Sequence, residues 1–287
     1  MGIKQRLILL NFLQFFIWGS WLLTIGAYWF QTKHWTGTEF GAIFSTMGIA
    51  SLFMPAIAGI LADRWINAER LYGIFHLIAA GILFMVPQVN DPSTMFWIML
   101  VNMIFYMPTI SLSITVAYSS LKSRGLDIVK EYPPIRVWGT VGFIVALWII
   151  SLSGLEKSAA QFYVASAASL FLGIYAFTLP ACPPLGGGHK KSFVSAMGLN
   201  AFALFKSAKM AIFFIFAMLL GASLQLTNAY GDTFLHDFAK IPVYQDLIAV
   251  KYPAIIMSIS QISETLFILT IPFFLRRFGI KKVMLFS

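Results

Sequence analysis

The chain has 287 residues and a net charge of +9, with 59% hydrophobic, 16% aromatic and only 11% charged residues, against about 25% charged residues in an average soluble domain. A soluble globule is excluded, because so few charged side chains could not cover its surface. The positive charge does not indicate nucleic-acid binding, since the basic residues lie in short gaps between apolar runs. We therefore predict an all-α membrane protein that crosses the bilayer several times.

Eight apolar runs have the length of about 20 residues that crosses a bilayer. The first is too long for the apolar core of a cleavable signal, which has roughly 7 to 15 residues, so we expect it to remain as a helix. In chain order the predicted spans are 7–30, 40–62, 71–89, 95–121, 135–154, 162–179, 210–229 and 253–275.

Basic residues are distributed unequally between alternate gaps. Sixteen of the 20 Lys and Arg residues fall on one side of the predicted membrane, Arg136 among them, and the remaining four on the other. Because cytoplasmic loops carry an excess of Lys and Arg, this split predicts a multi-pass protein of the inner membrane with its N-terminus in the cytoplasm.

The segment 181–209 is the predicted cytoplasmic linker. It opens with Pro183, Pro184 and a run of glycines, which favour loops. Its second part, 192–209, mixes Phe and Lys in a way that fits a short helix lying on an anionic leaflet, and an ordinary loop is the alternative. We predict a six-helix bundle over 1–180 and part of a second bundle over 210–287.

A weak internal repeat supports this division. Four of the ten positions 19–28 are identical to those at 221–230, and transporters are often built from duplicated bundles. A complete duplication would give about 400 residues and twelve helices. We therefore expect this chain to represent the first eight helices and the start of a ninth at 283–287.

Polar residues inside predicted spans indicate a partner or a function, because an ionised group there costs upward of about 2.5 kcal/mol. Glu264 is the one acid near the centre of a predicted span, and Gln261 precedes it by one turn. Gln225 and Asn228 form a similar pair within 210–229. Each pair lies on one face of its helix.

The fifth span shows the same pattern. Pro133 and Pro134 precede it and favour a helix start at this point. Arg136, Thr140 and Phe143 follow on one face. In the first span a further stripe contains Asn11, Gln14, Trp18 and Trp21.

These stripes predict a central cavity, in which amides bind a polar solute, an aromatic ring stacks on it, and Arg136 and Glu264 supply charge. A carboxyl at mid-membrane suits a proton carrier, because desolvation disfavours its ionised form. The alternative is that the polar groups simply pair between helices. That alternative is weakest for Glu264, because an amide could make the same contact without burying a charge.

A membrane enzyme is the competing class of protein. Enzymes of this kind need clustered His, Asp, Glu or Cys side chains, whereas the histidines are scattered over separate segments. We expect His236 and the adjacent Asp237 to be a solvated pair in a loop. A single cysteine, Cys182, provides neither a disulfide nor a metal cluster. We predict no enzymatic activity, no metal and no cofactor beyond a proton gradient.

Four stretches together point to a known family. They are FLQFFIWGSW at 12–21, FMPA at 53–56, PPIRVWGT at 133–140 and SISQISET at 258–265. With them the chain resembles, over 2–287, the bacterial nucleoside:proton symporter family of the major facilitator superfamily. The resemblance implies two six-helix bundles and proton-driven uptake of nucleosides, xanthosine among them, by alternating access. We expect a monomer in the bilayer with no nucleic-acid partner.

The resemblance also implies roles for individual residues. Asp63 and Arg64 are similar to the superfamily's gating loop, although Ile66 and Asn67 replace the usual glycine. Glu264 becomes the candidate for the coupling proton. Further binding groups of the family lie on its tenth helix, beyond this chain. The alternatives are a proton-coupled sugar or oligosaccharide carrier and a truncated chain without activity. The implied nucleoside-binding residues are Arg136, Thr140, Phe143, Gln225, Asn228, Gln261 and Glu264.

Overall fold

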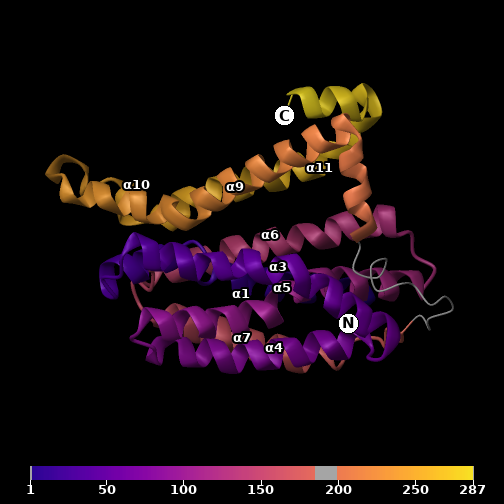
Figure 1. The fold of residues 1–287 in the computed structure, drawn as a ribbon, viewed down its shortest axis with the longest axis horizontal. Coiled ribbons are helices and arrows are strands. Elements are labelled where there is room, and N and C mark those ends of the chain that lie inside the picture. The colour runs from indigo at the N-terminus through magenta and orange to yellow at the C-terminus, as the bar shows by residue number, and fades with distance from the viewer. Residues whose placement is uncertain (1, 185–198, 287) are drawn as a thin grey trace.

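The computed structural model describes residues 2–184 and 199–286. Every regular element in this part of the chain is helical. Figure 1 shows α1 to α7 side by side, with α9, α10 and α11 along one side of them. The described elements are α1 (Ile3–Gly19), α2 (Ile25–Ala27), η1 (Tyr28–Thr32), α3 (Gly37–Arg64), α4 (Ala68–Met85), η2 (Val86–Gln88), α5 (Pro92–Lys122), α6 (Ile128–Leu152), α7 (Ala160–Ala176), η3 (Leu199–Lys206), α9 (Ala208–Asp237), η4 (Phe238–Lys240), η5 (Pro242–Tyr244), α10 (Ile248–Lys251) and α11 (Pro253–Phe286).

Several of these helices are long and apolar enough to cross a membrane, and α7 is a shorter apolar helix. By length and composition, five in the described ranges meet this criterion: Gly37–Arg64, Ala68–Gln88, Pro92–Lys122, Ile128–Leu152 and Ala208–Lys240. Each of the eight predicted spans contains a helix. The differences from the predicted spans lie at helix ends and at one break.

The first predicted span is interrupted. After α1 ends at Gly19, the chain makes a turn before α2 and then a π-helical turn, η1. The Ser20 hydroxyl donates to the Phe16 carbonyl at 2.8 Å, and the Thr24 hydroxyl donates to the side-chain oxygen of Gln161 at 2.7 Å. Hydroxyls that bond to nearby carbonyls compete with the helix and bend it. Hydropathy averages over such a break and cannot detect it.

The start of α6 differs from the predicted start. The helix begins at Ile128, where the Asp127 carboxylate accepts a hydrogen bond from the Val129 N–H at 2.9 Å, so Asp127 is its N-cap. Pro133 and Pro134 therefore lie inside the helix, and the prediction that they open it is wrong. The cap decides the start, and the prolines remove only two backbone donors near it.

The end of α9 also lies beyond the predicted span. The helix continues past residue 229 to Asp237, which brings Asp232 and His236 into it. Asp232 is thus a second acid within a long apolar helix, near its end, whereas Glu264 was predicted as the one acid near the centre of a span. The last turns of α9 contain polar residues, so the apolar run in the sequence ends at residue 229. The helix itself continues through these polar residues to Asp237.

The remaining boundaries concern the linker and the last helix. Of the predicted surface helix at 192–209, residues 192–198 lie outside the described residues, and Leu199–Lys206 forms the 3-10 helix η3 with Phe202 and Phe205 exposed. Gly279, with φ of 73°, interrupts the helical path of α11. The predicted start of a ninth run falls after this kink.

Close packing of α1 on α6 is the most extensive helix contact in the described chain. It depends on two glycines. A Cβ on Gly142 would overlap the carbonyl oxygen of Phe12, and a Cβ on Gly19 would lie 2.5 Å from the carbonyl oxygen of Phe143. Small residues allow helix backbones to approach in this way. This contact positions the face of α6 that carries Arg136, Thr140 and Phe143.

Gly142→Ala should therefore lower the melting temperature of the purified protein in detergent, since overpacking costs about 1–3 kcal/mol. Gly221→Ala on α9 is the matched control. No atom lies within 4 Å of the Cβ that it would add, and alanine favours a helix over glycine by about 1 kcal/mol. Equal melting temperatures for the two variants would contradict the packing argument.

Candidate functional site

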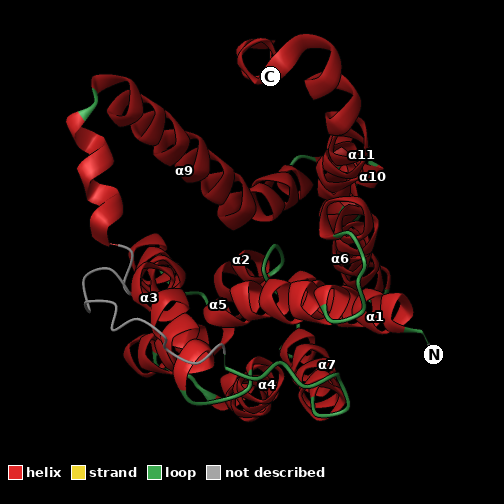
Figure 2. Cartoon of the chain, turned by 90° about the vertical axis from the view of Figure 1, so that its right-hand side faces the viewer, coloured by secondary structure: helices red, strands yellow, loops and turns green. Residues whose placement is uncertain are grey.

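The predicted site residues lie on three helices that border one region. Arg136, Thr140 and Phe143 are on α6, Gln225 and Asn228 on α9, and Gln261 and Glu264 on α11. α11 packs against both α6 and α9, and α9 also packs against α2. In Figure 2, α9 and α11 lie on the same side of the bundle as α2 and α6. The fold therefore brings these three polar stripes to one side of the first six spans.

The Arg136 side chain is positioned by contacts with neighbouring helices. Its guanidinium carbon lies 4.0 Å from the centre of the Phe15 ring, within the range of a cation–π contact. A Cβ on Gly139 would lie 2.8 Å from Arg136 Nη1, so the glycine leaves room for the side chain. Arg136 also interacts electrostatically with Glu264 of α11. α1, α6 and α11 together therefore position the guanidinium.

Thr140 and Phe143 continue the stripe toward the middle of α6. Their side chains are buried, with Phe143 only 7% exposed. Phe143 belongs to the main apolar core, together with residues of α1 and α2. Most of its ring is thus covered within the described chain, and the residue supports the α6 face rather than standing free.

On α9 the two predicted amides contact each other. Asn228 Nδ2 donates to Gln225 Oε1 at 3.0 Å, and Gln225 Nε2 lies 3.7 Å from Met47 Sδ of α3. Both side chains are half-buried. The weak sulfur acceptor leaves the Gln225 amide available for a stronger partner.

On α11, Gln261 is half-buried and Glu264 is exposed. The helix is tied to α6 by a hydrogen bond from Trp148 Nε1 to Ser258 Oγ at 3.0 Å. Gln225 and Asn228 are thus joined by a hydrogen bond, whereas Arg136 and Glu264 are related by electrostatic interaction.

Gln14 belongs instead to a buried polar network inside the first six spans. Gln14 Oε1 accepts from the Tyr72 hydroxyl at 2.7 Å and lies 2.9 Å from His76 Nε2, while Gln14 Nε2 donates to Thr109 Oγ1 at 2.9 Å. His76 Nδ1 in turn lies 3.1 Å from Ser169 Oγ. For Gln14, pairing between helices is therefore the correct interpretation. The sequence offered no signal for His76 as its partner.

The residues compared with a gating loop lie at the end of α3. Asp63 and Arg64 are its last two residues, and both are exposed. The next helix is anchored nearby, because Glu69 Oε2 accepts from the Cys182 N–H at 2.8 Å. The gating role of Asp63 and Arg64 stays a prediction.

Comparison with known proteins identifies the family. A family model described as "Nucleoside H+ symporter" matches residues 1–287. The chain belongs to the nucleoside H+ symporter family. It is 56% identical over 287 residues to the xanthosine permease of Escherichia coli K12, covering 100% of this chain and 69% of that protein. It is 53% identical to the nucleoside permease NupG of the same organism, with the same coverage.

Solved structures agree with this assignment. The crystal structure of the nucleoside transporter NupG matches with a TM-score of 0.88 at 53% identity, covering 99% of this chain and 70% of that one. A mutant of NupG matches with a TM-score of 0.92. The predicted major facilitator fold, the transporter class and proton-coupled nucleoside symport are confirmed, and the sugar-carrier alternative finds no support in this family match.

Proposed function

We propose that a nucleoside binds in the region bordered by α6, α9 and α11, and that it crosses the membrane with protons by alternating access. The observation that carries the proposal is Arg136, which is held on the Phe15 ring at 4.0 Å and interacts electrostatically with Glu264 of another helix. A held cation that interacts with a carboxylate on another helix offers hydrogen-bond donors, and the carboxylate is a group that can take up a proton.

The amides of this region are suited to the base and the ribose. Gln225, Asn228 and Gln261 each offer a donor and an acceptor on one side chain, and all three are half-buried. Half-buried amides can exchange their present contacts for those of a solute without unfolding a helix. Stacking of a base on Phe143 requires the ring to become more exposed than in this structure, where it lies in the main apolar core with residues of α1 and α2.

Glu264 is the proposed carrier of the coupling proton. When its carboxyl is ionised it attracts Arg136, and when protonated it loses most of that attraction. Protonation therefore changes what Arg136 can offer to a nucleoside. Coupling requires such a group, whose protonation and whose effect on the solute depend on each other.

The wider arrangement is proposed from the same sequence signals. The uneven distribution of Lys and Arg supports an N-terminus in the cytoplasm of a bacterium, with the protein in the inner membrane. The packing of α1 to α7 supports a first bundle over 1–180, with a linker at 181–209 and part of a second bundle over 210–287. We also propose that the protein acts as a monomer.

Competition for uptake tests the substrate class. In vesicles that carry the protein, excess unlabelled adenosine, uridine or xanthosine should reduce uptake of a labelled nucleoside, whereas glucose and lactose should not. A hexose lacks the base edge and would leave amides unpaired, at about 1–3 kcal/mol each, or roughly 5- to 150-fold in affinity per amide. Inhibition by glucose or lactose at concentrations comparable with the nucleosides would overturn the proposal.

A further inference from the structure

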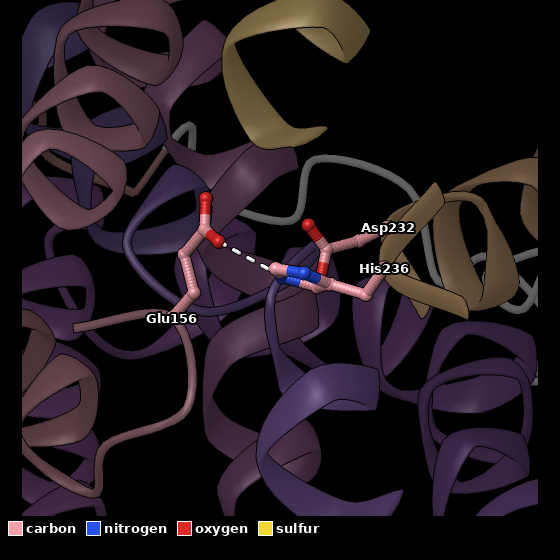
Figure 3. Close-up of side chains that lie close together, drawn as sticks. All are labelled: Glu156, Asp232 and His236. Atoms are coloured by element: carbon pink, nitrogen blue, oxygen red, sulfur yellow. Dashed lines mark hydrogen bonds and ion pairs between the residues drawn. The ribbon is translucent and has the colours of Figure 1, made fainter. Parts of the chain in front are cut away.

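Two carboxylates and an imidazole that have no part in the proposed nucleoside site meet in a buried cluster. Glu156 comes from the loop between α6 and α7, and Asp232 and His236 lie one turn apart on α9 (Figure 3). His236 Nε2 lies 3.0 Å from Glu156 Oε2 and 3.8 Å from Asp232 Oδ2. The exposed fractions of the three side chains are 7%, 0% and 6% for Glu156, Asp232 and His236.

The cluster corrects the expectation for this end of α9. His236 is buried and faces Glu156, so it does not form a solvated pair with Asp237. Asp237 is exposed instead and pairs with Lys240 at 2.7 Å. Consecutive helix residues point about 100° apart, which explains why these neighbours in sequence have different environments.

Negative charge in the cluster exceeds what its described neighbours neutralise. Glu156 Oε1 and both carboxylate oxygens of Asp232 are buried without a hydrogen-bond partner in the described chain. Lys157 interacts electrostatically with Asp232, but within the described ranges it forms no ion pair with either carboxylate. His236 can supply at most one positive charge. Buried carboxylates in such a place need a cation or a proton.

We propose that Glu156, Asp232 and His236 together bind one divalent transition-metal ion of the Zn²⁺ class. One ligand atom from each residue lies within 4.8 Å of the other two. Metal–ligand bonds of about 2.0–2.2 Å around a tetrahedral ion separate neighbouring ligand atoms by roughly 3.3 Å. The separations of 3.0 and 3.8 Å from His236 Nε2 to Glu156 Oε2 and Asp232 Oδ2 bracket this value, so small side-chain rotations would complete three corners of a tetrahedron.

The three ligand atoms, one imidazole nitrogen and two carboxylate oxygens, indicate which ion the site would bind. A nitrogen with two carboxylate oxygens suits Zn²⁺ and similar ions, whereas Mg²⁺ and Ca²⁺ prefer oxygen ligands in larger number. The i,i+4 spacing of Asp232 and His236 places both on one helix face, as two metal ligands on a single helix require. His236 also lines an open cleft of about 740 Å³, from which water could occupy a fourth position.

A bound ion would connect two parts of the chain. Glu156 follows α6 in the first six spans, and Asp232 lies one turn after Asn228 on α9. The ion would therefore fix α9 to the loop between α6 and α7, next to the proposed nucleoside site. Because the ion binds only the folded arrangement, it should also raise the melting temperature.

Zn²⁺ binding to the purified protein in detergent, after treatment with a chelator and dialysis, tests the site. The unaltered protein should bind one Zn²⁺ that equal concentrations of Mg²⁺ or Ca²⁺ do not displace. Asp232→Asn, His236→Gln and Glu156→Gln should each weaken this binding by at least about 100-fold, since loss even of an outer-shell partner costs about 10- to 100-fold. Co²⁺ at the same site should show the ligand-field absorption of a tetrahedral ion.

Two control variants lie beside the cluster. Asp237→Asn changes the next acid along the chain, and His34→Gln changes an exposed histidine that lines the same cleft. Both should bind Zn²⁺ as the unaltered protein does. Glu156→Gln lies in a loop and retains the shape of the side chain, so it separates loss of a ligand from loss of folding, which gel filtration monitors. Absence of Zn²⁺ binding, binding undiminished in all three cluster variants, or equal loss in the controls would overturn the proposal.

Discussion

Glu264→Gln should abolish accumulation of nucleoside driven by a pH gradient while leaving exchange of nucleoside across the membrane. Glutamine keeps the shape and the hydrogen-bonding capacity of the side chain but cannot take up or release a proton. It also removes the electrostatic interaction with Arg136 that the carboxylate makes. Transport should then no longer depend on the proton gradient.

The measurement is uptake of labelled nucleoside into vesicles with and without an imposed pH gradient, together with exchange in vesicles preloaded with unlabelled nucleoside. Glu131→Gln is the matched control, because Glu131 lies on the same helix as Arg136 but is paired with Lys4 and has no proposed role in binding. It should accumulate nucleoside normally. If Glu264→Gln still accumulates nucleoside with an unchanged pH profile, Glu264 has a structural role and another group carries the proton.

Arg136→Lys should reduce kcat/KM for uptake by at least about tenfold, equivalent to roughly 1.4 kcal/mol in the transition state. The planar guanidinium stacks on Phe15 at 4.0 Å and offers donors in a fixed fork. The lysine ammonium keeps the charge but not the plane or the fork. Loss of activity with the charge retained would therefore show that geometry matters at this position.

Arg70→Lys is the control for this change. Arg70 is exposed at the start of α4, and its Nε lies 3.9 Å from Glu69. The same substitution there should leave uptake unchanged. Phe15→Leu should produce part of the Arg136→Lys defect, because it removes the ring that holds the guanidinium. Normal uptake by Arg136→Lys would mean that a point charge is sufficient, and the stacked arrangement would have no part in transport.

The seven candidate binding residues are predicted from the sequence in two ways, by helical spacing and by resemblance to the family. Helical periodicity placed Arg136, Thr140 and Phe143 on one face, and the structure retains that face on α6. Periodicity could not show which stripes meet in space. The packing of α11 against α6 and α9 brings the stripes to one side, and the binding roles of these residues stay predictions until uptake is measured.

The sequence by itself determined that this is a helical membrane protein, because apolar segments of about 20 residues can cross lipid as helices, in which all backbone groups pair within the segment. It placed a helix in each predicted span but missed the break after Gly19 and the true ends of α6 and α9. The break involves a hydroxyl bonded to a nearby carbonyl, the start of α6 depends on a side-chain cap, and the end of α9 lies in polar turns, and hydropathy locates none of these.

Tertiary structure alone decided which distant polar groups meet. His76 pairs with Gln14 from another helix, and Glu156 meets His236 across 80 positions of sequence. Periodicity describes the faces of single helices, whereas such contacts depend on how helices pack and where loops return. A buried charge needs a compensating group that the fold brings to it, since the bilayer and the apolar core offer none.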